Sequence, residues 1–384
     1  MKPHCLFYTG QARAFHTGMK PAFYKFCGKV NTIFLTEPLF DEDEKEISDN
    51  DCYPVNQYKK ENLFIKNWRL KRLAKKLVYK YKPKLIVATS DMHSLFEMYL
   101  MRYGKQIGAK NVAVQWSLIV GSTTMANWVD EMNAHQRFPQ WIPFDVRMLL
   151  AGLRKYAGHF LYYWILPILA GEKPFLGRSS YILRVGCSGM RDSDIQTVFD
   201  NVFGMVFMMN GVPREKLAHF NPFEEKPKPF IDTKILTCII PSENQGGIDR
   251  DTNGFIDSRA RLNGWIDILL TIKDMANNWK IYISLHPETI GREVLIDMIQ
   301  GLSKRFVFID KSIPIENVIT RSSVIVGFPP SFSTVLYKTS IEYPSKKIIS
   351  LDPLGEKMGD YYKDFTGIRY IDNLEELKEE LNKL

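Results

Sequence analysis

Two apolar runs in the last third of the chain, each followed at once by polar residues, most constrain how the chain can fold. One lies in residues 280–288 (KIYISLHPE) and the other in residues 322–334 (SSVIVGFPPSFST). Short continuous apolar runs are typical of strands that are covered on both faces of a parallel sheet. In open sheets of this kind, ligands bind at the carboxyl ends of the strands. The pattern therefore predicts an α/β fold with a binding site at these two strand ends.

The polar side chains at these strand ends suit a phosphate group. Ser331, Ser333 and Thr334 stand where a helix is expected to begin, so hydroxyls, free backbone N–H groups and the positive helix end point the same way. His286 can donate a ring N–H to a phosphate oxygen or carry charge near neutral pH. Taken singly, such a hydroxyl turn is more often only a helix cap, and a His-Pro pair only a turn. Together, on two strand ends of one βα series, they favour an anion site.

The same elements in this order resemble the carboxy-terminal half of GT-B glycosyltransferases. The chain looks most like bacterial sialyltransferases, Kdo-transferase-like capsule enzymes, CDP-glycerol glycerophosphotransferases and hydrolysing UDP-GlcNAc 2-epimerases. The resemblance implies two Rossmann-like domains that face each other across a cleft. It also implies that the strand-end groups bind the nucleotide of a nucleotide sugar. The residues assigned to this role at the two motifs are His286, Pro287, Glu288, Ser331, Ser333 and Thr334.

A third polar turn, residues 242–247 (SENQGG), follows another apolar run, residues 234–241. Ser242 or Asn244 could donate a hydrogen bond to a phosphate or a sugar, and a simple loop is an equal alternative. Both residues join the predicted nucleotide-binding set.

The amino-terminal third supplies the candidate acceptor site. Gly10, Arg13 and His16 follow the predicted first strand, and two of these side chains could bind an anion; a plain turn with a solvated arginine is the alternative. The resemblance implies that this loop lies near the acceptor and the reacting centre. Gln115 ends a later strand where many relatives have Gln-His-Gly, and it is assigned to the same acceptor site.

The catalytic base is less clear, because Gln115 is followed here by Trp116 and Ser117 instead of the pattern of the relatives. Asp91 ends an apolar run, residues 85–90, at the expected ligand edge and could take a proton from the acceptor. Glu131, of an acidic pair, is the alternative. In an inverting transfer His286 would stabilise the departing phosphate, and no metal would be required.

Two further stretches suggest a surface role. Residues 59–84 hold eleven Lys or Arg against one Glu at helical apolar spacing, which predicts a basic amphipathic helix. Residues 156–170 are almost wholly apolar and aromatic, but they are too few to span a bilayer. Both could contact an anionic membrane. A packed helix with a solvated charged face and a helix buried between the domains are the simpler alternatives. Residues 41–46 read as a solvated acidic loop, and residues 192–210 as one helix.

Composition limits the remaining choices. A chain of 384 residues that is 45% hydrophobic can form two full cores. Five widely spread cysteines without a CxxC pair argue against a disulfide framework and a zinc site, so a reducing cytoplasm fits best. The first residues predict a strand and not a signal peptide.

These observations predict an acceptor domain over residues 1–225, with an aromatic insertion at about 143–177, and a nucleotide-sugar-binding domain over residues 226–384. The predicted protein is a metal-independent GT-B glycosyltransferase without a cofactor. The resemblance implies that it moves a sugar to a glycan or glycolipid acceptor of a surface polysaccharide, and it favours sialic acid or a Kdo-like sugar from a CMP donor. It would work in the cytoplasm or at the inner face of the plasma membrane, and would not bind nucleic acid. A hydrolysing nucleotide-sugar epimerase of the same fold and a non-catalytic glycan- or lipid-binding protein are the alternatives.

Overall fold

The computed structural model of the chain describes the following residues: 4–10, 15–28, 31–36, 39, 41–47, 51–55, 61–92, 94–115, 138–139, 141–175, 189, 191–199, 201–209, 211–223, 228–230, 232–241, 247–248, 255–256, 258–286, 289, 291–310, 312–329, 334–356 and 367–384. Contacts divide the chain into two units, residues 1–122 with 149–222, and residues 123–148 with 223–384.

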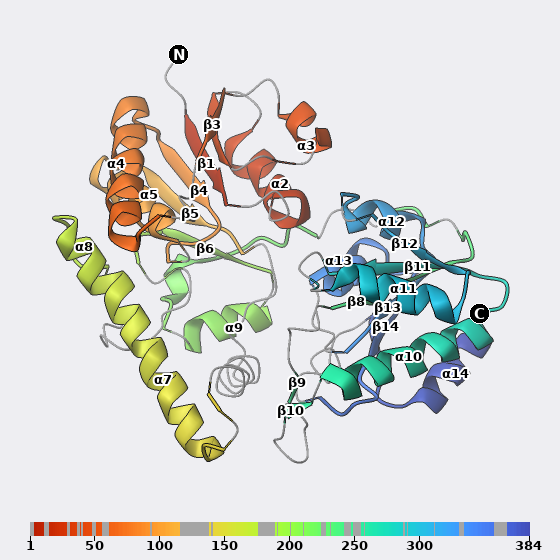
Figure 1. Ribbon diagram of the computed structural model, residues 1–384. Helices are drawn as coiled ribbons and strands as arrows, with labels where there is room; N and C mark the ends of the chain where they lie inside the picture. Colours follow the sequence, from red (N-terminus) through yellow and green to blue (C-terminus); the bar gives the residue numbers. More distant parts are fainter. Residues whose placement is uncertain are drawn as a thin grey trace. The chain divides into compact units, whose positions relative to one another are not determined.

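The first unit contains a parallel sheet with the order β3-β2-β1-β4-β5-β6-β7 (Figure 1). Its strands are β1 (Cys5–Thr9), β2 (Thr32–Thr36), β3 (Asp51–Pro54), β4 (Leu85–Ala88), β5 (Lys110–Ala113), β6 (Ile195–Val198) and β7 (Leu217–His219). The chain moves outward from β1 to β3 and then returns to pair β4 with the other side of β1. In sheets of this order, ligands bind beyond the carboxyl ends at the point of reversal, here between β1 and β4.

Both faces of this sheet are buried. Leu6 and Tyr8 of β1 pack into one apolar cluster, and Cys5 and Phe7 pack into another on the opposite face, because successive strand residues point to opposite sides. The helical segments before residue 223 are η1 (Phe15–Met19), α2 (Lys20–Ala22), η2 (Phe23–Cys27), α3 (Asp41–Glu46), α4 (Leu63–Tyr81), α5 (Leu95–Gln106), α7 (Phe144–Phe160), η3 (Leu161–Ile165), α8 (Leu166–Leu169), α9 (Asn201–Met209) and η4 (Arg214–Lys216).

The second unit repeats the same strand order in a parallel sheet, β12-β11-β8-β13-β14-β15. Its strands are β8 (Ile235–Ile240), β11 (Lys280–Leu285), β12 (Phe306–Phe308), β13 (Val324–Gly327), β14 (Lys347–Leu351) and β15 (Arg369–Ile371). Here the order reverses between β8 and β13. A separate antiparallel pair joins β9 (Gly247–Ile248) to β10 (Phe255–Ile256).

Five helices belong to this part of the described chain: α10 (Ser258–Met275), α11 (Arg292–Leu302), α12 (Ile315–Arg321), α13 (Thr334–Glu342) and α14 (Leu374–Asn382). Figure 1 shows α10 and α14 side by side. Trp265 and Leu269 of α10 and Leu377 of α14 pack with β8, β11 and β13 into one buried cluster.

The structure confirms the predicted α/β class with two Rossmann-like units. The limits 1–225 and 226–384, and those of the insertion, stay predictions. Three expectations were wrong. Residues 41–46 form α3, with Asp43 fully buried, and residues 195–198 form β6 ahead of α9. Cys5 and Cys27 form a disulfide with Cα atoms 5.8 Å apart, a pair that their separation of 22 residues did not signal.

Candidate functional site

The ends of β11, β8 and β13 lie together at the reversal point of the second sheet. The backbone N–H of His286, directly after β11, donates to the carbonyl of Ile240 at the end of β8, with N and O 3.0 Å apart. On the other side of β8, the N–H of Phe328 donates to the carbonyl of Ile239 at 2.9 Å. The strands that carry the two motifs therefore flank one central strand.

Two residues that follow β11 in the chain, His286 and Thr289, contribute side chains to this edge. His286 is half-buried, and its carbonyl accepts a hydrogen bond from the N–H of Thr289 at 3.1 Å. The side chain of Thr289 is buried, and its Oγ1 has no hydrogen-bond partner among the described residues. Such an unpaired hydroxyl costs free energy unless a ligand or water satisfies it.

Arg292, the first residue of α11, adds a positive charge to this edge. Its guanidinium donates to the carbonyls of Leu285 at 3.3 Å, of His286 at 3.4 Å and of Ile309 at 3.2 Å. These contacts hold the charge at the carboxyl ends of β11 and β12. The sequence argument missed Arg292 and Thr289; the only signal was their place, just after a strand end and at a helix start.

The structure describes part of the predicted nucleotide-binding set. Thr334 is the first residue of α13, as the predicted helix start requires. Trp265 reaches the same strand end from α10, since its Nε1 donates to the carbonyl of Pro329 at 3.0 Å. The predictions that fall outside the described residues are Ser242, Asn244, Pro287, Glu288, Ser331 and Ser333.

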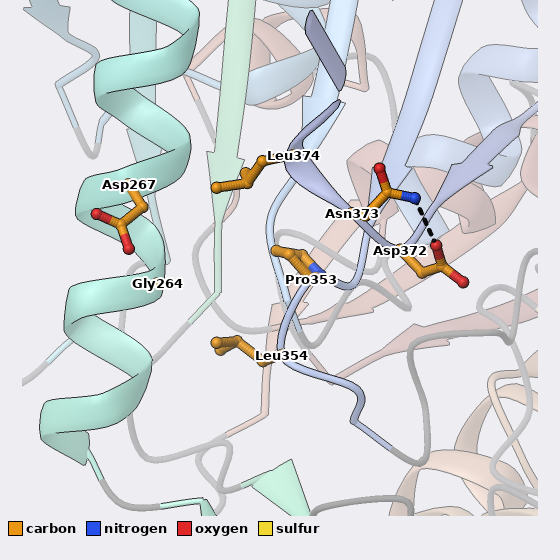
Figure 2. A pocket seen from close by; sticks show the side chains of 7 residues that line it. All are labelled: Gly264, Asp267, Pro353, Leu354, Asp372, Asn373 and Leu374. Atoms are coloured by element: carbon orange, nitrogen blue, oxygen red, sulfur yellow. Dashed lines mark hydrogen bonds between the residues drawn. The ribbon is translucent and has the colours of Figure 1, made fainter. Parts of the chain in front are cut away.

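A cavity of about 310 Å³ lies further along the same sheet edge, beyond the ends of β14 and β15 (Figure 2). It is lined by Gly264, Asp267, Pro353, Leu354, Asp372, Asn373 and Leu374. Asn373 donates to the carboxylate of Asp372 at 3.0 Å and accepts from the N–H of Glu376 at 2.8 Å, so it caps α14. The carboxylates of Asp267 and Asp372 disfavour a phosphate here, and no predicted site residue lines this cavity.

A buried ion pair is formed by two residues that are close in sequence to residues that line the cavity. Arg261 of α10 and Glu356 lie 3.1 Å apart, with 2% and 0% of their side chains exposed. Burial raises the pKa of Glu356 to about 7, although the charge of Arg261 opposes this rise. Burial likewise lowers the pKa of Arg261.

An acid–base pair joins the helical segments that follow β1 and β2 in the first unit. His16 lies on η1, a wide helical turn of a kind that is frequent at functional sites, seven residues beyond the end of β1. Its Nδ1 lies 2.9 Å from Oδ2 of Asp43, and Nζ of Lys20 donates to Oδ1 of Asp43 at 3.2 Å. Burial alone would raise the pKa of Asp43, but hydrogen bonds and charge from His16 and Lys20 outweigh it and lower the pKa.

Because Asp43 is ionised, it can only accept, so a neutral His16 carries its proton on Nδ1. In that tautomer Nε2 is the ring atom that could accept a proton, as in catalytic histidines that a carboxylate orients. His16 was predicted as an acceptor-binding residue, and that role stays a prediction. Asp43 was missed, because a carboxylate within a run of acidic residues reads as solvated. Gly10 follows β1 and is half-buried; Arg13 lies outside the described residues.

Asp91, the predicted base, is buried and fully engaged. Its Oδ1 accepts from the N–H of Gly189 at 2.8 Å, and its Oδ2 accepts from the N–H of Arg191 at 2.8 Å and the N–H and Oγ of Ser193 at 3.3 and 2.8 Å. From the other side, Nζ of Lys216 donates to the carbonyls of the same three residues. This arrangement suits a structural clamp. The role of Asp91 as the base stays a prediction.

Gln115 is also buried and engaged. Its N–H donates to Oγ1 of Thr197 and its Oε1 accepts from the N–H of Phe199, both at 2.9 Å. These bonds join the chain after β5 to β6, and the acceptor role of Gln115 stays a prediction. Glu131 lies outside the described residues. Within the described ranges, no group of three or more His, Cys, Asp or Glu side chains could hold a metal ion.

Comparisons with solved structures identify the fold. The chain is similar to a UDP-GlcNAc 2-epimerase from Neisseria meningitidis bound to UDP-GlcNAc, with a TM-score of 0.54, 10% identity, and coverage of 100% of this chain and 91% of the other. It is also similar to a Methanocaldococcus jannaschii UDP-GlcNAc 2-epimerase in complex with UDP-GlcNAc and UDP, with a TM-score of 0.53, 12% identity, and coverage of 99% of this chain and 91% of the other. For the S. aureus MnaA–UDP structure the TM-score is 0.54 and the identity 12%, and the match covers 100% of this chain and 86% of the other.

This chain has the two-domain α/β fold of these GT-B proteins. At such identities the likeness shows the fold. No protein-family model matches the chain, and no curated protein matches it.

Proposed function

We propose that this chain is an enzyme that acts on a nucleotide sugar. The observation that carries the proposal is the meeting of β11, β8 and β13 at the reversal point of the second sheet. There His286, the unpaired hydroxyl of Thr289 and the start of α13 stand at one edge, next to the charge of Arg292. These groups suit the phosphates of a nucleotide.

The reaction that the observations favour is hydrolysing epimerisation of a UDP-linked sugar, in which water replaces UDP at the anomeric carbon and UDP is released. Several proteins with this fold over nearly their whole length are UDP-GlcNAc 2-epimerases. Inversion at a ring carbon that bears hydrogen requires a group that removes a proton and a group that returns one. The His16–Asp43 pair is suited to such proton transfer, because an ionised carboxylate holds the ring in one tautomer.

Glycosyl transfer is the second candidate, and one observation favours it. α4 and α8 expose Trp68, Ile168 and Leu169 beside many Lys and Arg residues, as suits an enzyme that works on a lipid-linked acceptor. In this version the donor is a CMP-linked sialic acid or Kdo-like sugar. His16, Asp91 or Glu131 takes the proton of the acceptor hydroxyl, and no metal or cofactor is needed.

Incubation with UDP-GlcNAc in deuterated water separates the two reactions. An epimerase releases UDP without any acceptor and incorporates solvent deuterium at the inverted carbon, which proton NMR detects as loss of one ring signal. A transferase incorporates none and releases nucleotide from its donor only when an acceptor is present. His16→Ala should abolish turnover and leave nucleotide binding intact. Turnover of neither UDP-GlcNAc nor a CMP-linked sugar, with or without acceptor, would contradict the proposal.

A further inference from the structure

Two helices on the surface of the first unit are joined by polar bonds between their facing sides. Nδ2 of Asn67 on α4 donates to the carbonyl of Leu166 on α8 at 2.8 Å. One turn later, Nζ of Lys71 donates to the carbonyl of Ala170 and lies 3.2 Å from the carboxylate of Glu172. Asn67 is itself held by the hydroxyl of Tyr99 at 2.8 Å. These bonds fix the outer sides of α4 and α8 as neighbouring parts of one surface.

Large apolar side chains stand on this surface with about half of their area exposed. On α4, Phe64, Ile65 and Trp68 are 50%, 52% and 49% exposed, and on α8, Ile168 and Leu169 are 51% and 64% exposed. Phe64 and Trp68 lie on the flank of α4 that meets α8, because they are three residues before Asn67 and Lys71, respectively. We name these five residues the α4–α8 surface. Exposed apolar patches of this kind mark interaction sites.

Positive charge dominates beside the α4–α8 surface, where the carboxylates of Glu61 and Glu172 pair with Arg69 and Lys71. α4 contains seven Lys or Arg and no Asp or Glu. Five of these side chains are exposed along the same helix: Arg69, Arg72, Lys75, Lys76 and Lys80. The guanidinium of Arg72 lies 4.5 Å from the ring centroid of Trp68, so the basic and apolar groups are interleaved. The partner must therefore be both apolar and anionic.

We propose that the α4–α8 surface docks on a lipid bilayer with anionic headgroups. Trp and Phe suit the boundary between headgroups and acyl chains, and long Lys and Arg side chains reach phosphates while their stems cover apolar surface. Lysine is depleted in protein–protein interfaces, so the concentration of Lys on α4 favours lipid over a protein partner. Of the helices in the described ranges, none has the length and apolar content to cross a bilayer. The helices would lie on the membrane, and this contact does not depend on which sugar the enzyme uses.

Co-sedimentation of the full chain with vesicles tests the proposal. Vesicles of phosphatidylcholine mixed with phosphatidylglycerol should bind the protein, whereas vesicles of phosphatidylcholine alone should bind at least about tenfold more weakly, since each Lys or Arg near an anionic surface contributes about 1 kcal/mol. Raising the salt from about 0.1 M to about 1 M should release it, because the screening length falls from about 10 Å to about 3 Å.

Two double variants should each weaken binding to the mixed vesicles by about tenfold or more: Ile168→Ser with Leu169→Ser, and Arg72→Glu with Lys76→Glu. The matched controls are Val294→Ser and Lys304→Glu, exposed residues of the second unit that should leave binding unchanged. Circular dichroism checks that each variant is folded.

Three results would overturn the proposal. Folded wild-type protein could fail to bind the mixed vesicles, or it could bind both vesicle types equally. Alternatively, gel filtration could show a dimer that the Ile168→Ser, Leu169→Ser variant disrupts, which would make a second copy of the chain the occupant of the α4–α8 surface.

Discussion

Replacing Asp91 by Asn separates a structural role from a catalytic one. In the native protein its two oxygens accept four hydrogen bonds from the segment that contains Gly189 and Ser193. Asn keeps a single oxygen. If this oxygen takes the place of Oδ2, three bonds survive, and the new NH2 group faces the N–H of Gly189, so two donors oppose each other.

The expected loss of stability follows from these contacts. A buried polar group without a partner costs about 1–3 kcal/mol, and the surviving bonds also weaken when the acceptor loses its charge. Asp91→Asn should therefore lower the free energy of unfolding of the first unit by about 2–4 kcal/mol. For a domain of this size, 1 kcal/mol shifts Tm by about 2–4 °C, so Tm should fall by about 4–16 °C.

Thermal melts followed by circular dichroism measure this change. The control is Asp274→Asn, which removes the same charge from a side chain that is 67% exposed and should leave Tm within about 2 °C. At a temperature where the variant is folded, its turnover should stay close to that of the wild type. An unchanged Tm combined with a loss of turnover of about 10²–10⁴-fold would refute the structural role and identify Asp91 as the base.

Further predictions concern other buried groups. Asp43→Asn should lower kcat/KM by about tenfold or more while leaving nucleotide affinity unchanged, because His16 loses the carboxylate that sets its tautomer; kinetics and calorimetry measure the two effects. Glu356 has a folded pKa of about 7, above its unfolded value of about 4.3, so the stability it confers is present below about pH 4 and is lost as pH rises through 7. Urea titrations between about pH 4 and pH 7 should show that the free energy of unfolding declines less with rising pH in Glu356→Gln than in the wild type. Gly189→Ala should destabilise the chain by about 1–3 kcal/mol in the same titrations, since its φ is +92° and a Cβ would lie 2.7 Å from Cβ of Gln196.

The strands and the polar residues at their ends could be predicted from the sequence because they depend on local patterns. Buried parallel strands read as continuous apolar runs, and β4, β8, β11 and β13 all lie within runs of this kind. The His-Pro pair and the hydroxyl-rich helix start are short motifs that can be recognised without knowledge of the rest of the chain. Their meeting on either side of β8 follows from the strand order that this fold class shares.

What the sequence did not reveal depends on contacts between distant residues. Asp43 is buried because His16 and Lys20, 27 and 23 residues away, both pair with it, and no local pattern separates it from its solvated neighbours. Asp91 looked free at a strand end, yet its partners lie about a hundred residues later in the chain. β6 was predicted as part of a helix, because its four residues are too few to show the alternating pattern that distinguishes a strand from a helix.

Binding of a nucleotide to the second sheet tests the central claim most directly. Thermal shift and calorimetry with UDP, CDP, CMP and GDP should show that UDP stabilises the folded chain, because a ligand that binds only the native state raises Tm by mass action. His286→Ala should reduce this shift and leave the Tm of the ligand-free protein unchanged, while His219→Ala, an exposed histidine at the end of β7, should leave the shift intact. A shift with CMP in place of UDP would favour the transferase over the epimerase. If no nucleotide changes Tm, or if His286→Ala binds as tightly as the wild type, the proposed nucleotide site is contradicted.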